Sequence, residues 1–297
     1  MVQRKRGKYS NRVPLKEQLK EKLANVLTPE ELVLIPTRYQ IIGDILLLNL
    51  KTALLPHQET IAKGILEILP SIHTVYLHTG GVKGQFREPN QIQFIAGERK
   101  SVTQHVENHV IFEFDIEKIM FSKGNINERG KNLPKLVQPG EIIVDMFAGI
   151  GYFSIPMAIH ARPSQIYSIE MNPTSYGFLQ RNIQLNKVGT IITPLLGNCK
   201  DIVPKLAKDG IVADRIVMGL LPAPKEYLPT ALQLTHSGKK TILHYEGVAI
   251  RRDVEPLFQD VREACDKAGR SPTLREWRIV KNYGPFKYHS VLDCEVF

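Results

Sequence analysis

Short apolar runs alternate with segments of helical spacing along the second half of the chain. The runs predict strands at Ile142–Met146, Gln165–Ile169, Ile191–Leu196, Arg215–Met218 and Lys240–Tyr245. The spacing of apolar residues between and after them predicts helices at Tyr152–Ala161, Thr174–Leu185, Ile202–Leu206, Lys225–Leu234 and Val254–Ala268. Such strand–helix alternation indicates a parallel sheet that helices cover on both faces.

The end of the chain departs from this alternation. Two strand-like runs, Leu274–Tyr283 and Tyr288–Phe297, are joined through Gly284 and Pro285. An antiparallel hairpin that closes a parallel sheet is typical of the Rossmann-like methyltransferase fold. We therefore predict the α/β fold class, with a Rossmann-like class I catalytic domain over residues 116–297.

The first half reads as a small α+β module without a chemical motif of its own. Two short strands flank a turn at Gly43 and Asp44, and a helix is predicted at His57–Leu69. Further strand-like pieces are Thr74–His78, Gln91–Ala96, Val102–His105 and His109–Asp115. We assign residues 29–115 to a small α+β domain. Residues 1–28 form a basic N-terminal segment whose lysines and leucines have the spacing of a short amphipathic helix.

The composition is that of an intracellular globular protein with excess positive charge. The 297 residues are 43% hydrophobic and carry a formal net charge of +9, with a pI of about 9.3. The sequence has no apolar run long enough to span a membrane, and Cys199, Cys265 and Cys294 fit neither a disulfide framework nor a zinc site. We expect a cytoplasmic protein. Its charge suits either a nucleic-acid partner or a merely basic soluble protein.

A glycine-rich turn between two acid-tipped strands carries the main chemical signal. The first strand ends in Asp145, the turn contains Gly149 and Gly151, and the second strand ends in Glu170. Glycine lets the backbone adopt conformations closed to other residues and lets a ligand approach closely. An acid at the tip of the second strand is placed to accept hydrogen bonds from the hydroxyls of a ribose. The pattern predicts a nucleoside-type cofactor across the carboxyl ends of the strands.

The cofactor predicted from this pattern is S-adenosyl-L-methionine (AdoMet). A dinucleotide fold needs a third glycine, where this chain has Ser154, and Asp145 would repel a pyrophosphate. The pattern fits a positively charged cofactor without phosphate. The alternatives are a dinucleotide-binding oxidoreductase and an ordinary strand-turn-helix whose glycines occur by chance. The residues that we expect to line the cofactor site are Ser122, Arg129, Asp145, Phe147, Ala148, Gly149, Gly151, Glu170, Met171, Asn198, Cys199 and Gly219.

Two further positions bear on the reaction and on the cofactor. Amine-directed methyltransferases carry Asn or Asp before a proline after the fourth strand, where this chain has Gly219, which offers no side-chain acceptor. Asn198, after the third strand, suits either the adenine amino group or an ordinary turn. Because of Gly219, the side-chain oxygen that usually serves nitrogen methylation is absent.

Residues 115–133 form a polar, glycine-containing stretch before the first strand of the parallel sheet. Its Ser122, Lys123 and Arg129 could face a carboxylate or a phosphate, and the stretch could equally be a surface connection. Glu141, directly before that strand, reads as either a base or a solvated acid.

These residues resemble those of the archaeal and eukaryotic tRNA guanine-37 enzymes. The signatures that carry the resemblance are Asn127-Glu128-Arg129, Gly140-Glu141 leading into Val144–Gly151, and His244-Tyr245. The module around Tyr39–Ile45 also resembles the small domain that precedes the catalytic domain in that family. The family includes a guanine-N1 methyltransferase and the wybutosine-synthesis transferase, which moves the 3-amino-3-carboxypropyl group of AdoMet to a tricyclic wyosine precursor.

Three features favour the aminocarboxypropyl transferase. The methyltransferases carry Asn-Leu-Pro after the fourth strand, where this chain has Gly219-Leu220-Leu221-Pro222. The segment Met120–Asn125 resembles the connecting stretch of the transferases, and only residues 1–28 stand where the methyltransferases have an extra tRNA-binding domain. The alternatives are the guanine-N1 methyltransferase and an RNA-binding protein without catalytic activity.

The resemblance implies a reaction and a partner. The enzyme would act on position 37 of tRNA(Phe) and release methylthioadenosine, with the methionine tail of AdoMet turned toward the acceptor. Ser122 and Arg129 would hold that tail, Arg129 being reachable by solvent, and Glu141 would match the proposed base of the methyltransferases. The sequence leaves the oligomeric state open, and we expect a monomer.

Overall fold

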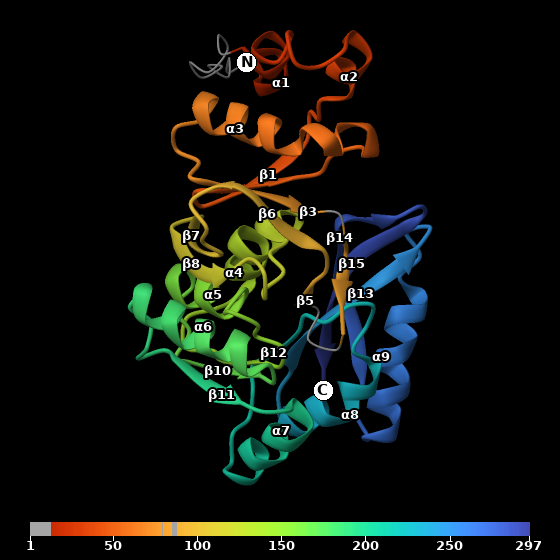
Figure 1. Cartoon of the computed structure of the whole chain (residues 1–297). Helices are drawn as coiled ribbons and strands as arrows, with labels where there is room; N and C mark the ends of the chain where they lie inside the picture. The colour runs from red at the N-terminus through yellow and green to blue at the C-terminus, as the bar shows by residue number, and fades with distance from the viewer. Residues whose placement is uncertain (1–12, 79, 85–87) are drawn as a thin grey trace, which may run out of the picture. The chain divides into compact units, whose positions relative to one another are not determined.

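Two compact units make up the structure, a computed structural model (Figure 1) that describes residues 13–78, 80–84 and 88–297. Unit 1 holds the chain up to His105 together with Phe114–Met120, and unit 2 holds Val106–Glu113 and Phe121–Phe297. The domain limits expected after residues 28 and 115 stay predictions. Within the described ranges, no helix is both long and apolar enough to cross a membrane.

Unit 1 is built on a small mixed sheet. Strands β1 (Tyr39–Ile42) and β2 (Ile45–Leu48) pair antiparallel around the predicted turn, β3 (Thr74–His78) runs parallel to β2, and β6 (Ile92–Gly97) runs antiparallel to β3. Helix α3 (Gln58–Ile68), preceded by the 3-10 turn η1 (Thr52–His57), makes the parallel crossover from β2 to β3. The short pairs are β4 (Val82–Lys83) with β5 (Glu88–Pro89), and β7 (Val102–Glu107) with β8 (Val110–Asp115), whose turn end, Val106–Glu113, belongs to unit 2.

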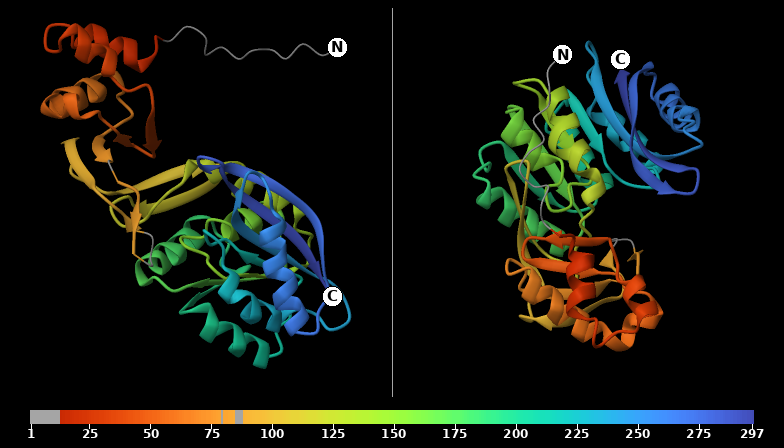
Figure 2. Two further views of the ribbon diagram at one scale, coloured as in Figure 1. Left: turned by 90° about the vertical axis from the view of Figure 1, so that its right-hand side faces the viewer. Right: turned by 90° about the horizontal axis from the view of Figure 1, so that it is seen from above.

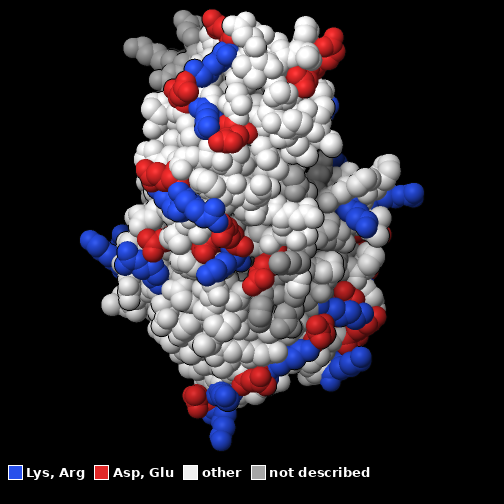
Figure 3. All heavy atoms as spheres, viewed as in Figure 1, with Lys and Arg blue, Asp and Glu red and all other residues white. Residues whose placement is uncertain are grey.

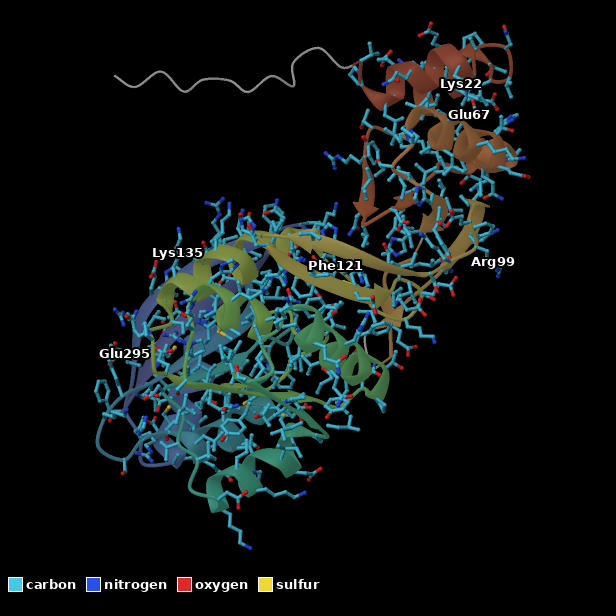
Figure 4. The ribbon with its side chains drawn as sticks, turned by 90° about the vertical axis from the view of Figure 1, so that its left-hand side faces the viewer. Lys22, Glu67, Arg99, Phe121, Lys135 and Glu295 are labelled. Carbon is cyan, nitrogen blue, oxygen red and sulfur yellow. The ribbon has the colours of Figure 1, made fainter. Side chains whose placement is uncertain are left out.

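Two N-terminal helices complete the core of unit 1. The predicted amphipathic helix is present as α1 (Leu15–Lys22), and it is followed by α2 (Pro29–Leu34), which Thr28 and Glu31 cap reciprocally. The leucine face of α1 is buried against α3, and the lysines lie on the outer side, where Lys22 pairs with Glu67 (Figure 4). This helix is therefore a packing element of unit 1.

Unit 2 contains the predicted sheet of seven strands, in the order β11-β10-β9-β12-β13-β15-β14. Strands β9 to β13 run parallel, and β15 lies antiparallel between β13 and β14. The strand bounds are Ile142–Asp145 (β9), Gln165–Glu170 (β10), Ile192–Leu196 (β11), Arg215–Met218 (β12), Thr241–Ile250 (β13), Pro272–Gly284 (β14) and Lys287–Val296 (β15). The Rossmann-like α/β fold and its closing hairpin are confirmed.

Helices cover both faces of this sheet. Helices α7 (Cys199–Lys208), α8 (Leu228–Ala231) and α9 (Glu255–Lys267) share one buried apolar cluster with β9, β12 and β13. On the opposite face lie α4 (Leu133–Leu136), α5 (Ser154–His160) and α6 (Pro173–Leu185), as the right-hand view of Figure 2 shows. The strand order turns back at β9, so the carboxyl ends of β9 and β12 form the switch point where ligands of such sheets bind.

Two predicted helices differ from the observed ones. The segment predicted as one helix, Lys225–Leu234, is broken into η4 (Lys225–Tyr227), α8 and η5 (Leu232–Leu234), because Pro229 has no amide hydrogen to continue a helix through it. Helix α7 begins three residues earlier than predicted, since the side chain of Asn198 accepts a hydrogen bond from the Lys200 amide (2.9 Å) and caps it.

The connecting stretch before β9 is folded into the body of unit 2. It forms the short turns η2 (Lys123–Asn125) and η3 (Glu128–Asn132, π-helical), followed by α4. Buried Glu128 accepts hydrogen bonds from Nε (2.9 Å) and Nη2 (2.6 Å) of Arg278 on β14, and it faces Nε2 of His244 on β13 at 3.3 Å. Arg278 also donates to Asp293 on β15 (2.6 Å).

This buried network is charged. Burial opposes ionisation of Glu128, but the hydrogen bonds from His244 and Arg278 outweigh it and hold the pKa of Glu128 well below its usual range. Burial alone would lower the pKa of His244, and the adjacent Asp293 raises it instead. Two of the family signatures, Asn127-Glu128-Arg129 and His244-Tyr245, thus meet in one network that fixes the connecting stretch to the hairpin strands.

Arg129 is buried, with 2% of its side chain exposed, so the expectation that solvent reaches it is wrong. Its Nε and Nη2 atoms pair with the Glu107 carboxylate, and its Nη1 donates to the Ser122 carbonyl at 2.8 Å. The guanidinium also lies over the ring of Phe121 at 4.4 Å from the ring centroid (Figure 4 labels Phe121). Each arm of the guanidinium therefore has a partner within the protein.

Replacing Arg129 with Ala should lower the free energy of unfolding by about 3–5 kcal/mol, because it removes the buried guanidinium that pairs with the buried Glu107 carboxylate. Urea denaturation measures the loss. Arg275→Ala, which removes an exposed pairing with Glu295, is the matched control and should cost about 1 kcal/mol or less. Arg129→Met combined with Glu107→Met should cost less than Arg129→Met alone, and additive losses would contradict the coupling of the pair.

Candidate active site

Asp145 lies fully buried at the carboxyl end of β9. Its Oδ2 accepts a hydrogen bond from the Ser154 hydroxyl (2.6 Å), which in turn accepts one from the Ser168 hydroxyl on β10 (2.7 Å). Its Oδ1 accepts from the Phe147 amide at 3.3 Å. The acid thus ties together the strand, the following turn, the start of α5 and the neighbouring strand.

The protonation of Asp145 is strongly perturbed. Burial raises its pKa to about 7, although the hydrogen bonds from Ser154 and the Phe147 amide oppose the rise. The negative charges of Glu170 and Glu246 contribute to the same rise. A cation bound beside Asp145 would favour the ionised carboxylate, so this site is suited to a positively charged ligand.

The glycine turn is held against Glu170, the acid at the end of β10. The Gly149 amide donates to Glu170 Oε2 and the Asn172 amide to Oε1, both at 2.7 Å. Gly149 has φ +58°, and a Cβ on it would lie 2.6 Å from the ring of Tyr152, so glycine is required there. Burial raises the pKa of Glu170, while the amides around it act in the opposite direction. Glu170 is half-buried, so a ligand at this edge can reach it.

Apolar side chains are unusually exposed at the same edge. Met171, after β10, is 38% exposed, and Leu196, the last residue of β11, is 47% exposed. Phe147 contacts Tyr227 edge-on with ring centroids 5.0 Å apart. Asn172, 5% exposed, has a side-chain nitrogen without a hydrogen-bond partner among the described residues. This combination of apolar surfaces and an unpaired amide suits a planar nitrogen-containing ring.

Two predicted cofactor residues have structural contacts of their own. The oxygen of the Asn198 side chain is occupied by the cap of α7. Cys199 packs in the core with 3% exposure, and burial raises the pKa of its thiol to about 12. Only the backbone of Cys199 and the side-chain nitrogen of Asn198 remain to face a ligand.

Gly219 follows β12 directly and is partly exposed. A Cβ on it would lie 2.8 Å from the ring of Phe153 and 3.8 Å from the carboxyl carbon of Glu246. Glu246 on β13 is 2% exposed and shares a 2.8 Å hydrogen bond with Nε2 of His289 on β15. The switch point therefore has a third carboxylate, which we did not single out from the sequence as a site residue.

The structure does not bring every predicted residue to this edge. Glu141 lies at the amino end of β9, where it pairs with Arg215 (2.9 Å), so its position speaks against the role of base. Arg129 pairs with Glu107, and the Ser122 hydroxyl accepts a hydrogen bond from Lys281 on β14 (2.6 Å). Brought together at the carboxyl ends of β9, β10 and β12 are Asp145, Phe147, Ala148, Gly149, Gly151, Glu170, Met171 and Gly219.

Family models and known proteins match most of the chain. The model of the TRM5/TYW2 methyltransferase domain matches residues 103–271, and that of the TYW2 N-terminal domain matches residues 19–100. The chain is 35% identical over 286 residues to the tRNA(Phe) (4-demethylwyosine(37)-C(7)) aminocarboxypropyltransferase of Pyrococcus horikoshii, covering 95% of this chain and 98% of that protein. It is 32% identical to the tRNA (guanine(37)-N(1))-methyltransferase Trm5b of Pyrococcus abyssi, covering 91% and 78%.

Solved structures agree with these matches. The crystal structure of Pyrococcus horikoshii TYW2 in complex with MeSAdo has a TM-score of 0.79 and 32% sequence identity, and the superposition covers 95% of this chain and 99% of that one. The resemblance to the tRNA guanine-37 enzymes is confirmed. The chain belongs to the TRM5/TYW2 family and is an AdoMet-dependent transferase.

Proposed function

We propose that this enzyme transfers the 3-amino-3-carboxypropyl group of AdoMet to 4-demethylwyosine at position 37 of tRNA(Phe), with release of methylthioadenosine. The observation that carries the proposal is the 35% identity, along 95% of the chain, to an enzyme named for this reaction. Gly219 supports it over guanine-N1 methylation, because that position offers no side-chain oxygen to accept from an N–H.

The residues at the switch point fit AdoMet. Its sulfonium makes the attached carbons electrophilic, and the carbon that faces the acceptor is the one transferred. We assign the ribose hydroxyls to the Glu170 carboxylate and the faces of the adenine to Met171 and Leu196. The backbone of Gly149 and Gly151 allows close approach, and Asp145 balances the positive charge.

The connecting stretch is assigned a supporting role at the methionine tail. The Ser122 hydroxyl keeps the role predicted for it, with Lys281 beside it as a cation. Arg129 acts indirectly, because its three nitrogen atoms are occupied by Glu107 and the Ser122 carbonyl. Arg129 thereby fixes the backbone that presents Ser122.

The proposal extends to the partner of the enzyme and to its cellular location. The net charge of +9 favours association with the phosphates of tRNA. On the face in Figure 3, Lys and Arg side chains are interspersed with acids, so that view shows no single-sign patch. We propose that the enzyme acts as a monomer in the cytoplasm. We also propose that contacts to the anticodon region, in addition to charge, determine how the tRNA docks.

Product analysis tests the proposed function. The enzyme is incubated with AdoMet and tRNA carrying either guanosine or 4-demethylwyosine at position 37, and the nucleosides and the spent cofactor are identified by mass spectrometry. We expect an aminocarboxypropyl gain on the precursor, together with methylthioadenosine. A methyl gain on either base, with release of S-adenosylhomocysteine, would contradict the proposal.

The affinity for AdoMet should depend on pH through Asp145. The free enzyme has a pKa of about 7 at this group, and a bound sulfonium favours the ionised form and lowers that pKa. Affinity should therefore level off above about pH 7 and fall by up to about tenfold per unit below it. Calorimetric titration of wild type and Asp145→Asn measures the difference, and the variant subtracts the titration of the ligand itself. Equal pH dependence in both proteins would count against this role of Asp145.

A further inference from the structure

Glu246 and His289 form a buried acid–imidazole pair on adjacent strands. Glu246 lies on β13 and His289 on β15, two positions apart in the antiparallel register, since Glu246 pairs with Val291 and Val248 with His289. Their side chains are 2% and 0% exposed and share a hydrogen bond of 2.8 Å between Glu246 Oε2 and His289 Nε2. Such a pair is costly to bury unless its remaining polar atoms find partners.

Each member of the pair has an atom without such a partner. Neither Glu246 Oε1 nor His289 Nδ1 makes a hydrogen bond to any described residue. Buried polar groups in folded proteins are nearly always satisfied, and an exception calls for an explanation such as a catalytic role, a bound water or ion, or strain. The unpaired oxygen of Glu246 therefore points to a function at this place.

The other two acids of the switch point differ from Glu246, because each of their oxygens has a donor within the protein. Both oxygens of Asp145 accept hydrogen bonds, from Ser154 and the Phe147 amide. Both oxygens of Glu170 accept them too, from the Gly149 and Asn172 amides. Of these three carboxylates, Glu246 alone has an oxygen for which the described residues supply no donor.

Glu246 lies beside Gly219, the position at which amine-directed methyltransferases have a side-chain oxygen for the acceptor. Its carboxyl carbon is 3.8 Å from the point that a Cβ on Gly219 would occupy. Gly219 is partly exposed and has no side chain that could separate the Glu246 carboxylate from the end of β12. The ring of Phe153 lies closer still, at 2.8 Å from the same point.

The proposed reaction requires a base at the acceptor. The acceptor carbon forms a bond to the γ-carbon of the methionine tail, the γ-carbon–sulfur bond breaks, and its electron pair leaves with sulfur in methylthioadenosine. The acceptor carbon then carries both its original hydrogen and the new substituent, and the ring carries the positive charge. The aromatic ring is restored only when a base removes that proton.

We propose that the Glu246 carboxylate takes this proton and that His289 positions it, an inference that rests on the proposed function. The substrate proton goes to the unpaired Oε1, while His289 Nε2–H donates to Oε2 whether the Glu246 carboxyl is ionised or protonated. The pair therefore keeps its hydrogen bond before and after the proton is transferred.

Glu246→Gln tests the proposal, because it keeps the shape of the side chain and removes the base. Transfer to precursor tRNA should be slowed by about 10²–10⁴-fold. Deuterium at the reacting carbon should slow the variant further and leave wild type unaffected, since removal of the proton then limits the rate. Glu246→Asp should recover part of the rate, and Glu276→Gln, an exposed acid on β14, is the matched control that should match wild type.

Two measurements separate this role from a structural one. Calorimetry without tRNA, at a pH well above 7 where Asp145 is ionised in both proteins, should give Glu246→Gln the AdoMet affinity of wild type, and thermal unfolding should give it a similar Tm. An unchanged transfer rate, a slowed rate without an isotope effect, or a loss of AdoMet affinity that accounts for the slower rate would each overturn the proposal.

Failure of the proposed function would look different. If wild type itself transfers a methyl group, or does not use the tricyclic precursor, the reaction assignment fails before the variants are compared. If wild type forms the aminocarboxypropyl product and Glu246→Gln forms it equally fast, only the role of Glu246 fails.

Discussion

The buried carboxylate of Asp145 is the constraint around which the site is organised. It sits where the strand order of the sheet reverses, and its hydrogen bonds hold the Phe147 amide and the Ser154 hydroxyl in place. Removing a carboxylate from water is unfavourable for its charged form, which is why the pKa of Asp145 rises to about 7. A cationic ligand would relieve that cost, so we propose that the group that shapes the glycine turn also favours the sulfonium of AdoMet.

A second set of buried charges fixes the geometry from the other side. Glu128 and Arg129 are adjacent in sequence, yet their side chains pair with different parts of unit 2, Arg278 on β14 and Glu107 on β7. Breaking such pairs is destabilising because each leaves an uncompensated charge. The connecting stretch is consequently held at two points, which gives the Ser122 hydroxyl a defined position beside Lys281.

The sheet and the glycine turn could be predicted because their signals are local. Apolar runs mark the strands, and Asp145, Gly149 and Glu170 lie within one strand-turn-helix-strand unit. The burial of Arg129 could not be predicted in this way. A charged residue in a polar stretch is expected to be solvated, and its buried partner lies 22 residues away in the sequence. Arg278 lies 150 residues from Glu128, and the buried partner of Glu246, His289, lies 43 residues further along the chain. Tertiary pairing alone reveals these roles.

The central claim is that AdoMet lies over the carboxyl ends of β9 and β10 with its methionine tail, and not its methyl group, toward Gly219. A crystal structure of the enzyme with AdoMet tests it most directly. We predict that both ribose hydroxyls lie within hydrogen-bond distance of the Glu170 carboxylate and that the γ-carbon is closer to Gly219 than the methyl carbon is. A ribose away from Glu170, or a methyl carbon facing Gly219, would contradict the account.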